Sequence, residues 1–205
     1  MRILTPTENK RLNELVGFVG LSLAVLLALS LLSYSPHDAS FNVSAPAASG
    51  QARNWIGPVG AHTADLFAGS GALGLEALSR GAAQVTFVDQ DEAAAAALRA
   101  LLIEWQAHGA QVLRSDALRF LGRPPQACDI VFLDPPFAGE LLGRAAALLS
   151  ERSWLKAGAL IYVECAAREG LPPLPQSWQP LKAQRAGEVG YHLFTHAAPA
   201  QRQAI

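Results

Sequence analysis

Short apolar runs alternate with stretches of helical periodicity from Asp65 onward. The apolar runs are rich in Val, Ile, Leu and Phe, which favour buried strands, and they lie at 84–89, 110–115, 128–134 and 159–164. Before and after the first run, the segments LGLEALSRG and DEAAAAALRALLIEW place apolar residues three and four positions apart, as helices do. Strands that alternate with helices predict an α/β fold, with a parallel sheet covered by helices on both faces.

The pattern changes near the end of the chain. The segment WQPLKAQRAGEVGYHLFTH predicts two strands joined by a turn at Gly187–Glu188. We therefore expect an antiparallel hairpin at one edge of an otherwise parallel sheet. Residues 197–205 are expected to form a flexible tail.

The beginning of the chain has a different character. No charged residue occurs from Leu15 to Pro36. As a helix, the twenty residues 15–34 would extend about 30 Å, which matches the apolar core of a bilayer. We predict a transmembrane helix at 15–34; a buried core helix is the alternative, and the run is too long for a signal peptide.

The flanks of this run predict its orientation. Lys10 and Arg11 precede it and Asp38 follows it, which favours a cytoplasmic N-terminus. Residues 35–63 are rich in Ser, Ala, Pro and Gly, so we expect a loop or linker there.

Composition narrows the class of protein. The 205 residues are 51% hydrophobic and 16% charged, which excludes disordered, fibrous and coiled-coil proteins. The net charge of −1 predicts no general attraction to nucleic acid or anionic lipid. Cys128 and Cys165 lie far apart and lack metal-ligand spacing, so we expect two buried thiols and no metal site.

A glycine-rich loop, DLFAGSG at 65–71, precedes the first predicted helix. Gly69 and Gly71 lack a Cβ, so the backbone can turn sharply there and approach a ligand closely. Gly74 completes the spacing GxGxxG, which leaves a nicotinamide dinucleotide as an alternative ligand. A glycine turn without any ligand is the other alternative.

Acidic residues follow the next two strands. Asp89 ends the first of them, where a carboxylate can accept hydrogen bonds from two ribose hydroxyls; a solvated acid is the alternative. Asp91 or Glu92 could cap the helix that follows. Asp116 could accept a hydrogen bond from an adenine amino group, or could cap a helix at 117–121.

The motif DPPF at 134–137 directly follows an apolar strand. Its two prolines fix φ and hold a rigid turn. Asp134 and the carbonyl of Pro135 can accept the two hydrogens of an exocyclic amino group, and Phe137 offers a ring for base stacking. These contacts would expose the nitrogen lone pair to an electrophilic methyl group. A plain Pro-Pro turn is the alternative, but it does not account for the flanking acid and aromatic residues.

Five motifs occur in order: DLFAGSGALGLEALSRGAAQVTFVDQD, SDALRFL, DIVFLDPPF, WLKAGALIYVE and KAQRAGEVGYHLF. Through them, residues 64–196 strongly resemble the RsmD-type family of bacterial 16S ribosomal RNA guanine N2-methyltransferases. The resemblance implies a class I, Rossmann-like methyltransferase domain that uses S-adenosylmethionine and no metal. It implies a flipped guanine of 16S ribosomal RNA, free or in a small-subunit assembly intermediate, as the methyl acceptor.

The resemblance also implies roles for individual residues. The residues that would bind the cofactor are Asp65, Ala68, Gly69, Ser70, Gly71, Asp89, Asp116 and Ala117. The catalytic residues, which would hold the guanine, are Asp134, Pro135, Pro136 and Phe137.

Residues 10–64 resemble a second family, the FtsK-type DNA translocases, in their first membrane helix and periplasmic loop. The segments NELVGFVGLSLAVLLALSLLSYSPHDASFNVSA and NWIGPVGAH carry this resemblance. Because the chain has no GxxxxGK[ST] phosphate loop, only a membrane anchor is implied. This segment stands where RsmD-type proteins carry a basic N-terminal part. The first strand is therefore expected to be short, with His62 and Thr63 at normally apolar positions.

Two hypotheses of function follow. The first is methyl transfer from S-adenosylmethionine to the 2-amino group of a guanine in 16S ribosomal RNA, impaired by the missing N-terminal part. From Asp65 onward, 12 Lys or Arg residues stand against 14 Asp or Glu residues, which leaves few cations for phosphate. The alternative is a membrane-anchor or interaction protein with an inactive methyltransferase remnant, from a chimeric gene or an assembly artefact. Either way we expect membrane association through helix 15–34, and the methyltransferase domain would have to face the cytoplasm to act.

Overall fold

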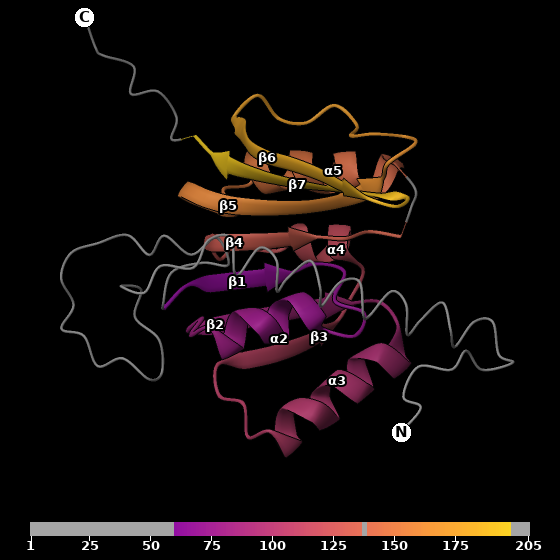
Figure 1. Ribbon diagram of the computed structural model, residues 1–205. Helices are drawn as coiled ribbons and strands as arrows, with labels where there is room; N and C mark the ends of the chain where they lie inside the picture. The colour runs from indigo at the N-terminus through magenta and orange to yellow at the C-terminus, as the bar shows by residue number, and fades with distance from the viewer. Residues whose placement is uncertain (1–59, 137–138, 198–205) are drawn as a thin grey trace, which may run out of the picture.

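The computed structural model describes residues 60–136 and 139–197. Seven strands form one sheet in the order β3-β2-β1-β4-β5-β7-β6, with helices on both faces (Figure 1). The strands are β1 (His62–Asp65), β2 (Gln84–Asp89), β3 (Ala110–Arg114), β4 (Cys128–Leu133), β5 (Leu155–Ala166), β6 (Trp178–Ala186) and β7 (Val189–His196). The helices are α2 (Ala72–Ser79), α3 (Glu92–Glu104), α4 (Ala117–Leu121) and α5 (Gly139–Glu151).

The strand directions confirm the predicted mixed sheet. Strands β1 to β5 run parallel to one another, and β7 pairs antiparallel with both β5 and β6. The turn between β6 and β7 lies at Gly187 and Glu188, where the sequence predicts it. Along β6 the pairing register shifts between Pro180 and Lys182.

Apolar side chains fill the space between the sheet and each helical layer. On one face, α4 and α5 contribute Phe120, Leu142 and Leu149 to a large buried cluster. On the other face, α2 and α3 contribute Ala77 and Leu98 to a second cluster. The sheet is therefore enclosed by α2 and α3 on one side and by α4 and α5 on the other.

Strand β1 lies at the centre of this sheet and has only four residues, as expected. The His62 N–H donates to Oδ2 of Asp129 at 2.8 Å, and Nζ of Lys156 binds the same oxygen at 2.8 Å. These contacts tie the start of β1 to β4 and β5. Thr63 is buried and paired with Ile130, and its hydroxyl has no hydrogen-bond partner among the described residues.

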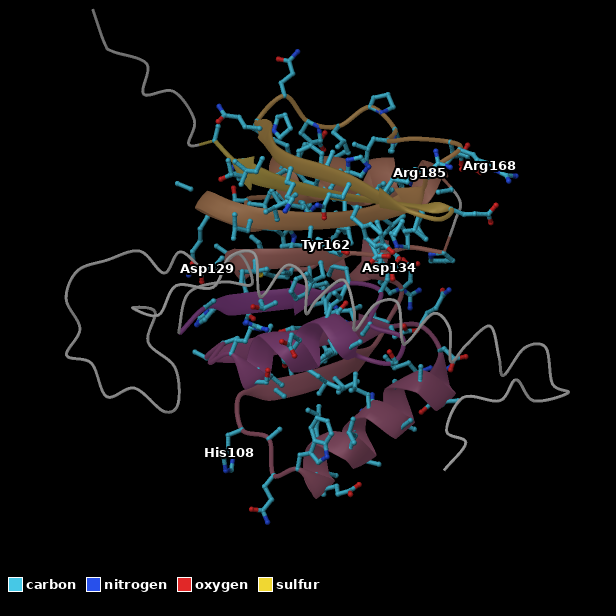
Figure 2. The ribbon with its side chains drawn as sticks, viewed as in Figure 1. His108, Asp129, Asp134, Tyr162, Arg168 and Arg185 are labelled. Carbon is cyan, nitrogen blue, oxygen red and sulfur yellow. The ribbon has the colours of Figure 1, made fainter. Side chains whose placement is uncertain are left out.

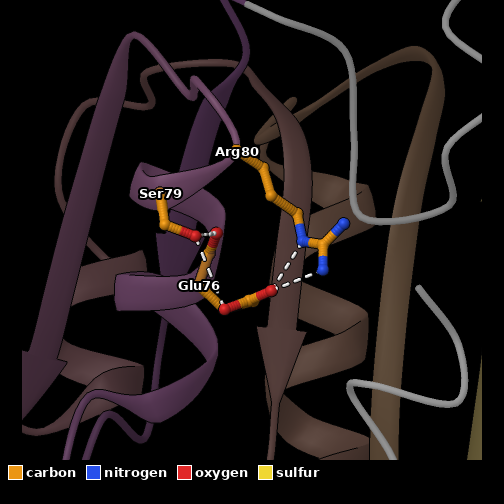
Figure 3. A network of polar contacts seen from close by, with 3 residues as sticks. All are labelled: Glu76, Ser79 and Arg80. Atoms are coloured by element: carbon orange, nitrogen blue, oxygen red, sulfur yellow. Dashed lines mark hydrogen bonds and ion pairs between the residues drawn. The ribbon is translucent and has the colours of Figure 1, made fainter. Parts of the chain in front are cut away.

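Helix α2 ends in a small polar network (Figure 3). Arg80 forms an ion pair with Glu76, four residues earlier, at 2.6 Å. The Ser79 hydroxyl donates to the Glu76 carbonyl oxygen at 2.8 Å. An ion pair at this spacing contributes roughly 0.2–0.5 kcal/mol, so the network adds a small stabilisation to the last turn of α2.

The expectation of membrane association is corrected by the described part of the chain. No helix in 60–136 or 139–197 is both long and apolar enough to span a membrane. Helices α3 and α5 have 13 residues each and would extend about 20 Å, short of a bilayer core of about 30 Å. The predicted helix at 15–34 lies outside the described residues. Of the predicted linker, His62 and Thr63 belong to β1.

Candidate active site

A cavity of about 350 Å³ opens at the carboxyl ends of the parallel strands. It lies beside β1, whose neighbours are β2 on one side and β4 on the other, so the strand order reverses there. In open α/β sheets ligands bind at such a reversal. The residues that line the cavity are Leu66, Phe67, Gly69, Asp89, Gln90, Asp91, Ser115, Asp116, Ala117, Asp134, Pro135, Pro136 and Leu141.

The loop from β1 to α2 has the sharp turn that its glycines predict. Gly69 and Gly71 have φ of 50° and 79°, in the left-handed region that favours glycine. The Gly71 N–H donates to the Ala68 carbonyl at 2.6 Å, which closes the turn. A Cβ on Gly71 would lie 2.6 Å from Cδ1 of Leu98. Gly71 is therefore required by both its backbone conformation and its packing.

Asp65 lies beneath this loop and is fully buried at the end of β1. Its Oδ2 accepts a hydrogen bond from the Gly74 N–H at 3.1 Å. Gly71 precedes α2 and has no side chain to cap the helix. The Asp65 carboxylate instead accepts a hydrogen bond from one of the first N–H groups of α2. Burial is the main cause that raises the pKa of Asp65 to about 7, and the charges of Asp134 and Asp89 add to it.

Gly74 has a packing role in this arrangement. A Cβ at Gly74 would collide with the ring of Phe87 on β2. The glycine lets α2 approach the sheet closely, which is the third glycine's role in nucleotide-binding loops. The GxGxxG spacing is therefore explained without a dinucleotide.

Asp89 connects the loop to the end of β2. Its Oδ2 accepts from the Gly69 N–H at 2.7 Å, and its Oδ1 accepts from the Asp91 N–H at 2.8 Å. Asp91 caps α3 by accepting from the Ala94 N–H at 2.8 Å, as the sequence allowed. Asp89 thus orders the glycine loop while its carboxylate lines the cavity.

Asp116 is a helix cap, which is one of the two roles that the sequence left open. Its Oδ1 accepts from the Arg119 N–H at 2.9 Å, so Asp116 is the N-cap of α4. Asp116 and Ala117 also line the cavity, which leaves Oδ2 of Asp116 for a ligand. Capping and ligand binding are therefore compatible at this residue.

The Asp-Pro-Pro turn borders the same cavity. Asp134 directly follows β4, and Figure 2 shows it at the opposite end of this strand from Asp129. Asp134, the buried Pro135 and the exposed Pro136 all contribute to the lining. Burial raises the pKa of Asp134 to about 6. Phe137 lies outside the described residues.

The structure thus brings together seven of the predicted residues around one cavity: Gly69, Asp89, Asp116, Ala117, Asp134, Pro135 and Pro136. Asp65, Ala68 and Gly71 are buried and do not line it, and Ser70 is exposed. Ser115 was not predicted; it lines the cavity, and its N–H donates to the Asp89 carbonyl at 2.8 Å. Within the described ranges, no group of three or more His, Cys, Asp or Glu residues is arranged to hold a metal ion.

Glu164 was not predicted either; it is buried on β5 with a relative exposure of 3%. Its Oε1 accepts a hydrogen bond from the Tyr162 hydroxyl at 2.9 Å. Burial, together with the charges of Asp134 and Asp65, raises the pKa of Glu164 to about 8. The only sequence signal was a glutamate at the end of the apolar run ALIYVE.

Comparison with known proteins gives one consistent result. A family model described as "Conserved hypothetical protein 95" matches residues 38–195. The ribosomal RNA small subunit methyltransferase D of Escherichia coli is 42% identical over 153 residues, 74% of this chain and 77% of that protein. The protein of the same name from Haemophilus influenzae is 42% identical over 147 residues, 69% and 76% of the two chains. The solved structure of Escherichia coli yhhF matches with a TM-score of 0.67 and 43% identity, covering 69% and 80%.

Proposed function

Because this chain belongs to the family described as conserved hypothetical protein 95, we propose that it methylates the 2-amino group of a guanine in 16S ribosomal RNA with S-adenosylmethionine. The names of its relatives in Escherichia coli and Haemophilus influenzae support methyl transfer to small-subunit ribosomal RNA. One observation carries the proposal: the Asp134-Pro135-Pro136 turn and the glycine loop with Asp89 border one cavity. An amine acceptor and a nucleoside-type donor would meet there.

The lining residues fit S-adenosylmethionine. Each oxygen of Asp89 already accepts one backbone N–H and can accept a second hydrogen bond, here from a ribose hydroxyl. Oδ2 of Asp116 can accept from the adenine amino group beside Ala117. The turn at Gly69 lets the backbone approach the methionine part without a Cβ in the way.

We assign the site of the substrate amine to the part of the cavity that Asp134 and Pro135 line. The Asp134 carboxylate and the Pro135 carbonyl would accept the two amine hydrogens and turn the nitrogen lone pair toward the donor. S-adenosylmethionine supplies an electrophilic methyl group on a positively charged sulfur. The guanine would have to leave its helix to enter the cavity, since its amine is otherwise enclosed by base pairing and stacking.

The proposal includes the domain boundaries. Residues 64–196 are the proposed methyltransferase domain; its sheet begins two residues earlier, at His62, and ends at His196. The likeness of residues 10–64 to FtsK-type translocases stays a prediction from sequence.

The alternatives are less well supported. If the ligand were a nicotinamide cofactor, the Asp-Pro-Pro turn would have no function in binding it. The glycine at position 74 is required because a Cβ there would collide with the ring of Phe87. An inactive remnant would not be expected to keep seven predicted site residues around one cavity.

Calorimetric titration of S-adenosylmethionine into the full-length protein tests the donor site. We expect saturable binding in the micromolar range and no binding of NAD. Transfer of a labelled methyl group to 16S ribosomal RNA, or to immature small subunits, tests the acceptor. A folded sample that binds no S-adenosylmethionine would overturn the proposal.

A further inference from the structure

Glu164 lies on β5 beside the end of β4, which Asp134 directly follows. Leu133 of β4 pairs with Val163 of β5, and Asp134 and Glu164 are the residues that follow this pair. Neighbouring parallel strands lie about 4.8 Å apart, so the two backbones are adjacent where β4 ends. Residues two apart on a strand share a face, so Glu164 lies on the face of β5 that carries Tyr162, and the charge of Asp134 acts on it from beyond the end of β4. Figure 2 shows Tyr162 further back along β5 and Asp134 at the strand end.

The surroundings of Glu164 contain acids, phenols and a thiol from β1, β5 and β7 and from the segment that follows β4. The titratable groups that interact with it are Asp134 beyond β4, Asp65 on β1, Tyr162 and Cys165 on β5, and Tyr191 on β7. Tyr191 is its direct cross-strand partner. None of these groups is a cation, so nothing among them compensates a second negative charge beside Asp134.

We propose that Glu164 is a positioning residue for methyl transfer, holding a proton so that Asp134 is the single anion facing the substrate amine. This inference rests on the proposed function. It accounts for a buried glutamate that does not line the cavity but lies on the strand next to the one that Asp134 follows.

The proton balance of the reaction explains why a neutral Glu164 is needed. The amine nitrogen forms a bond to the methyl carbon, and the carbon–sulfur bond breaks with its electron pair going to sulfur. The nitrogen is then positively charged and loses one proton to the Asp134 carboxylate, which releases it to water through the cavity. Glu164 keeps its own proton throughout, so Asp134 remains a free base before each turnover.

The pH dependence of single-turnover methyl transfer tests this role. Glu164 ionises at alkaline pH, and two adjacent carboxylates then repel each other and disturb the amine site. We expect the wild-type rate to fall about fivefold or more between pH 7 and pH 9. Glu164→Gln, which cannot ionise, should abolish that fall. Glu169→Gln removes an exposed glutamate of the following loop and should keep the wild-type profile.

A second variant keeps the test informative if Glu164→Gln does not fold. The Tyr162 hydroxyl donates to Glu164 and lowers the pKa of its carboxyl, so Tyr162→Phe should raise that pKa. The alkaline fall in rate should then move to higher pH. A wild-type rate that stays flat to pH 9, or a fall that Glu164→Gln retains, would overturn the inference.

Failure of the proposed function is recognised separately. If the wild-type protein binds no S-adenosylmethionine and methylates no RNA at any pH, the proposed function is wrong, and the positioning role that rests on it is wrong too. In that case, the pH dependence of the free energy of unfolding, measured by urea denaturation, still shows whether Glu164 is protonated in the folded state. The wild type should lose stability relative to Glu164→Gln between pH 5 and pH 9, and parallel curves would show that Glu164 holds no proton.

Discussion

Substitution of Asp134 should slow methyl transfer while leaving donor binding largely unchanged. It borders the cavity at the end of β4, the strand next to β1, and the loop that would hold the donor follows β1. We expect Asp134→Ala to change the affinity for S-adenosylmethionine by less than about threefold and to slow methyl transfer by about 100-fold or more. Calorimetry and single-turnover kinetics measure the two effects. Equal losses in both would instead make Asp134 a structural or donor-binding residue.

Thr63 on the central strand β1 tests the effect of a buried hydroxyl on stability. Its buried hydroxyl has no partner among the described residues, and a buried polar group without a hydrogen bond costs about 1–3 kcal/mol. We expect Thr63→Val, which keeps the shape, to raise the free energy of unfolding by about 1 kcal/mol in urea denaturation.

Thr86 on the neighbouring strand is the matched control. It is also buried, but its hydroxyl accepts a hydrogen bond from Nε2 of Gln111 at 2.7 Å. Thr86→Val should therefore lower stability by about 1 kcal/mol. A loss in both variants would mean that the Thr63 hydroxyl is satisfied in solution.

Among the elements, α2 depends on its close approach to β2. A methyl group at Gly74 would meet the ring of Phe87, which is itself fully buried. We expect Gly74→Ala to destabilise the protein by about 1–3 kcal/mol, in spite of the higher helix propensity of alanine. Thermal and urea denaturation measure the change.

Gly143 in α5 is the control for this substitution. A Cβ there would make only ordinary contact with Pro172, at 3.6 Å. Gly143→Ala should be neutral or stabilise by up to about 1 kcal/mol. The prediction for Gly74 fails if the two variants behave alike.

The elements that could be predicted from sequence are those whose signal is local. Strand periodicity located β2, β3 and the hairpin of β6 and β7, and the glycine spacing located the loop before α2. Strand β5 begins at Leu155, earlier than the apolar run at 159–164, because its first residue pairs with Cys128 on β4. That pairing depends on tertiary packing and leaves no periodic signal in the segment LKAG.

The candidate site was predictable to the same extent. Asp89, Asp116 and Asp134 follow strands directly, so their positions at the carboxyl edge follow from the alternation of elements. Glu164 could not be recognised, because the groups around it lie on β1, on β7 and just after β4, far from it in the sequence. The resemblance assigns Asp65 to the cofactor, which stays a prediction; in the structure Asp65 is buried, does not line the cavity and accepts a hydrogen bond from the Gly74 N–H of α2.

For the whole molecule, the buried acids set the direction of the pH dependence. Asp65, Asp134 and Glu164 all have pKa values above those of an unfolded chain, so the folded state retains protons that the unfolded state releases. Their stabilising contribution is complete below about pH 4 and is lost as the pH rises through about 6 to 8. We expect the free energy of unfolding to fall by about 2 kcal/mol or more between pH 5 and pH 8.5 in urea denaturation.

Two residues test whether the buried acids cause this loss of stability at high pH. Asp65→Asn keeps an oxygen for the Gly74 N–H and should flatten the curve around pH 7. Asp129 acts in the opposite direction: Lys156 and the His62 N–H lower its pKa against the opposing effect of burial. Its contribution is therefore present above pH 4 and is lost at lower pH. Stability that rises steadily from pH 5 to pH 8.5 would contradict the raised values.

Strand β6 lies at the edge of the described sheet, and its register shifts at Pro180. An open strand edge is a template on which strands of other molecules can add, and long flat edges promote aggregation. Proline lacks the N–H that such pairing requires, and a bulge bends the strand away from the geometry of a regular ladder. The irregular stretch at Pro180 is therefore a poor template for a further strand, and we expect strand addition at the β6 edge to be disfavoured there.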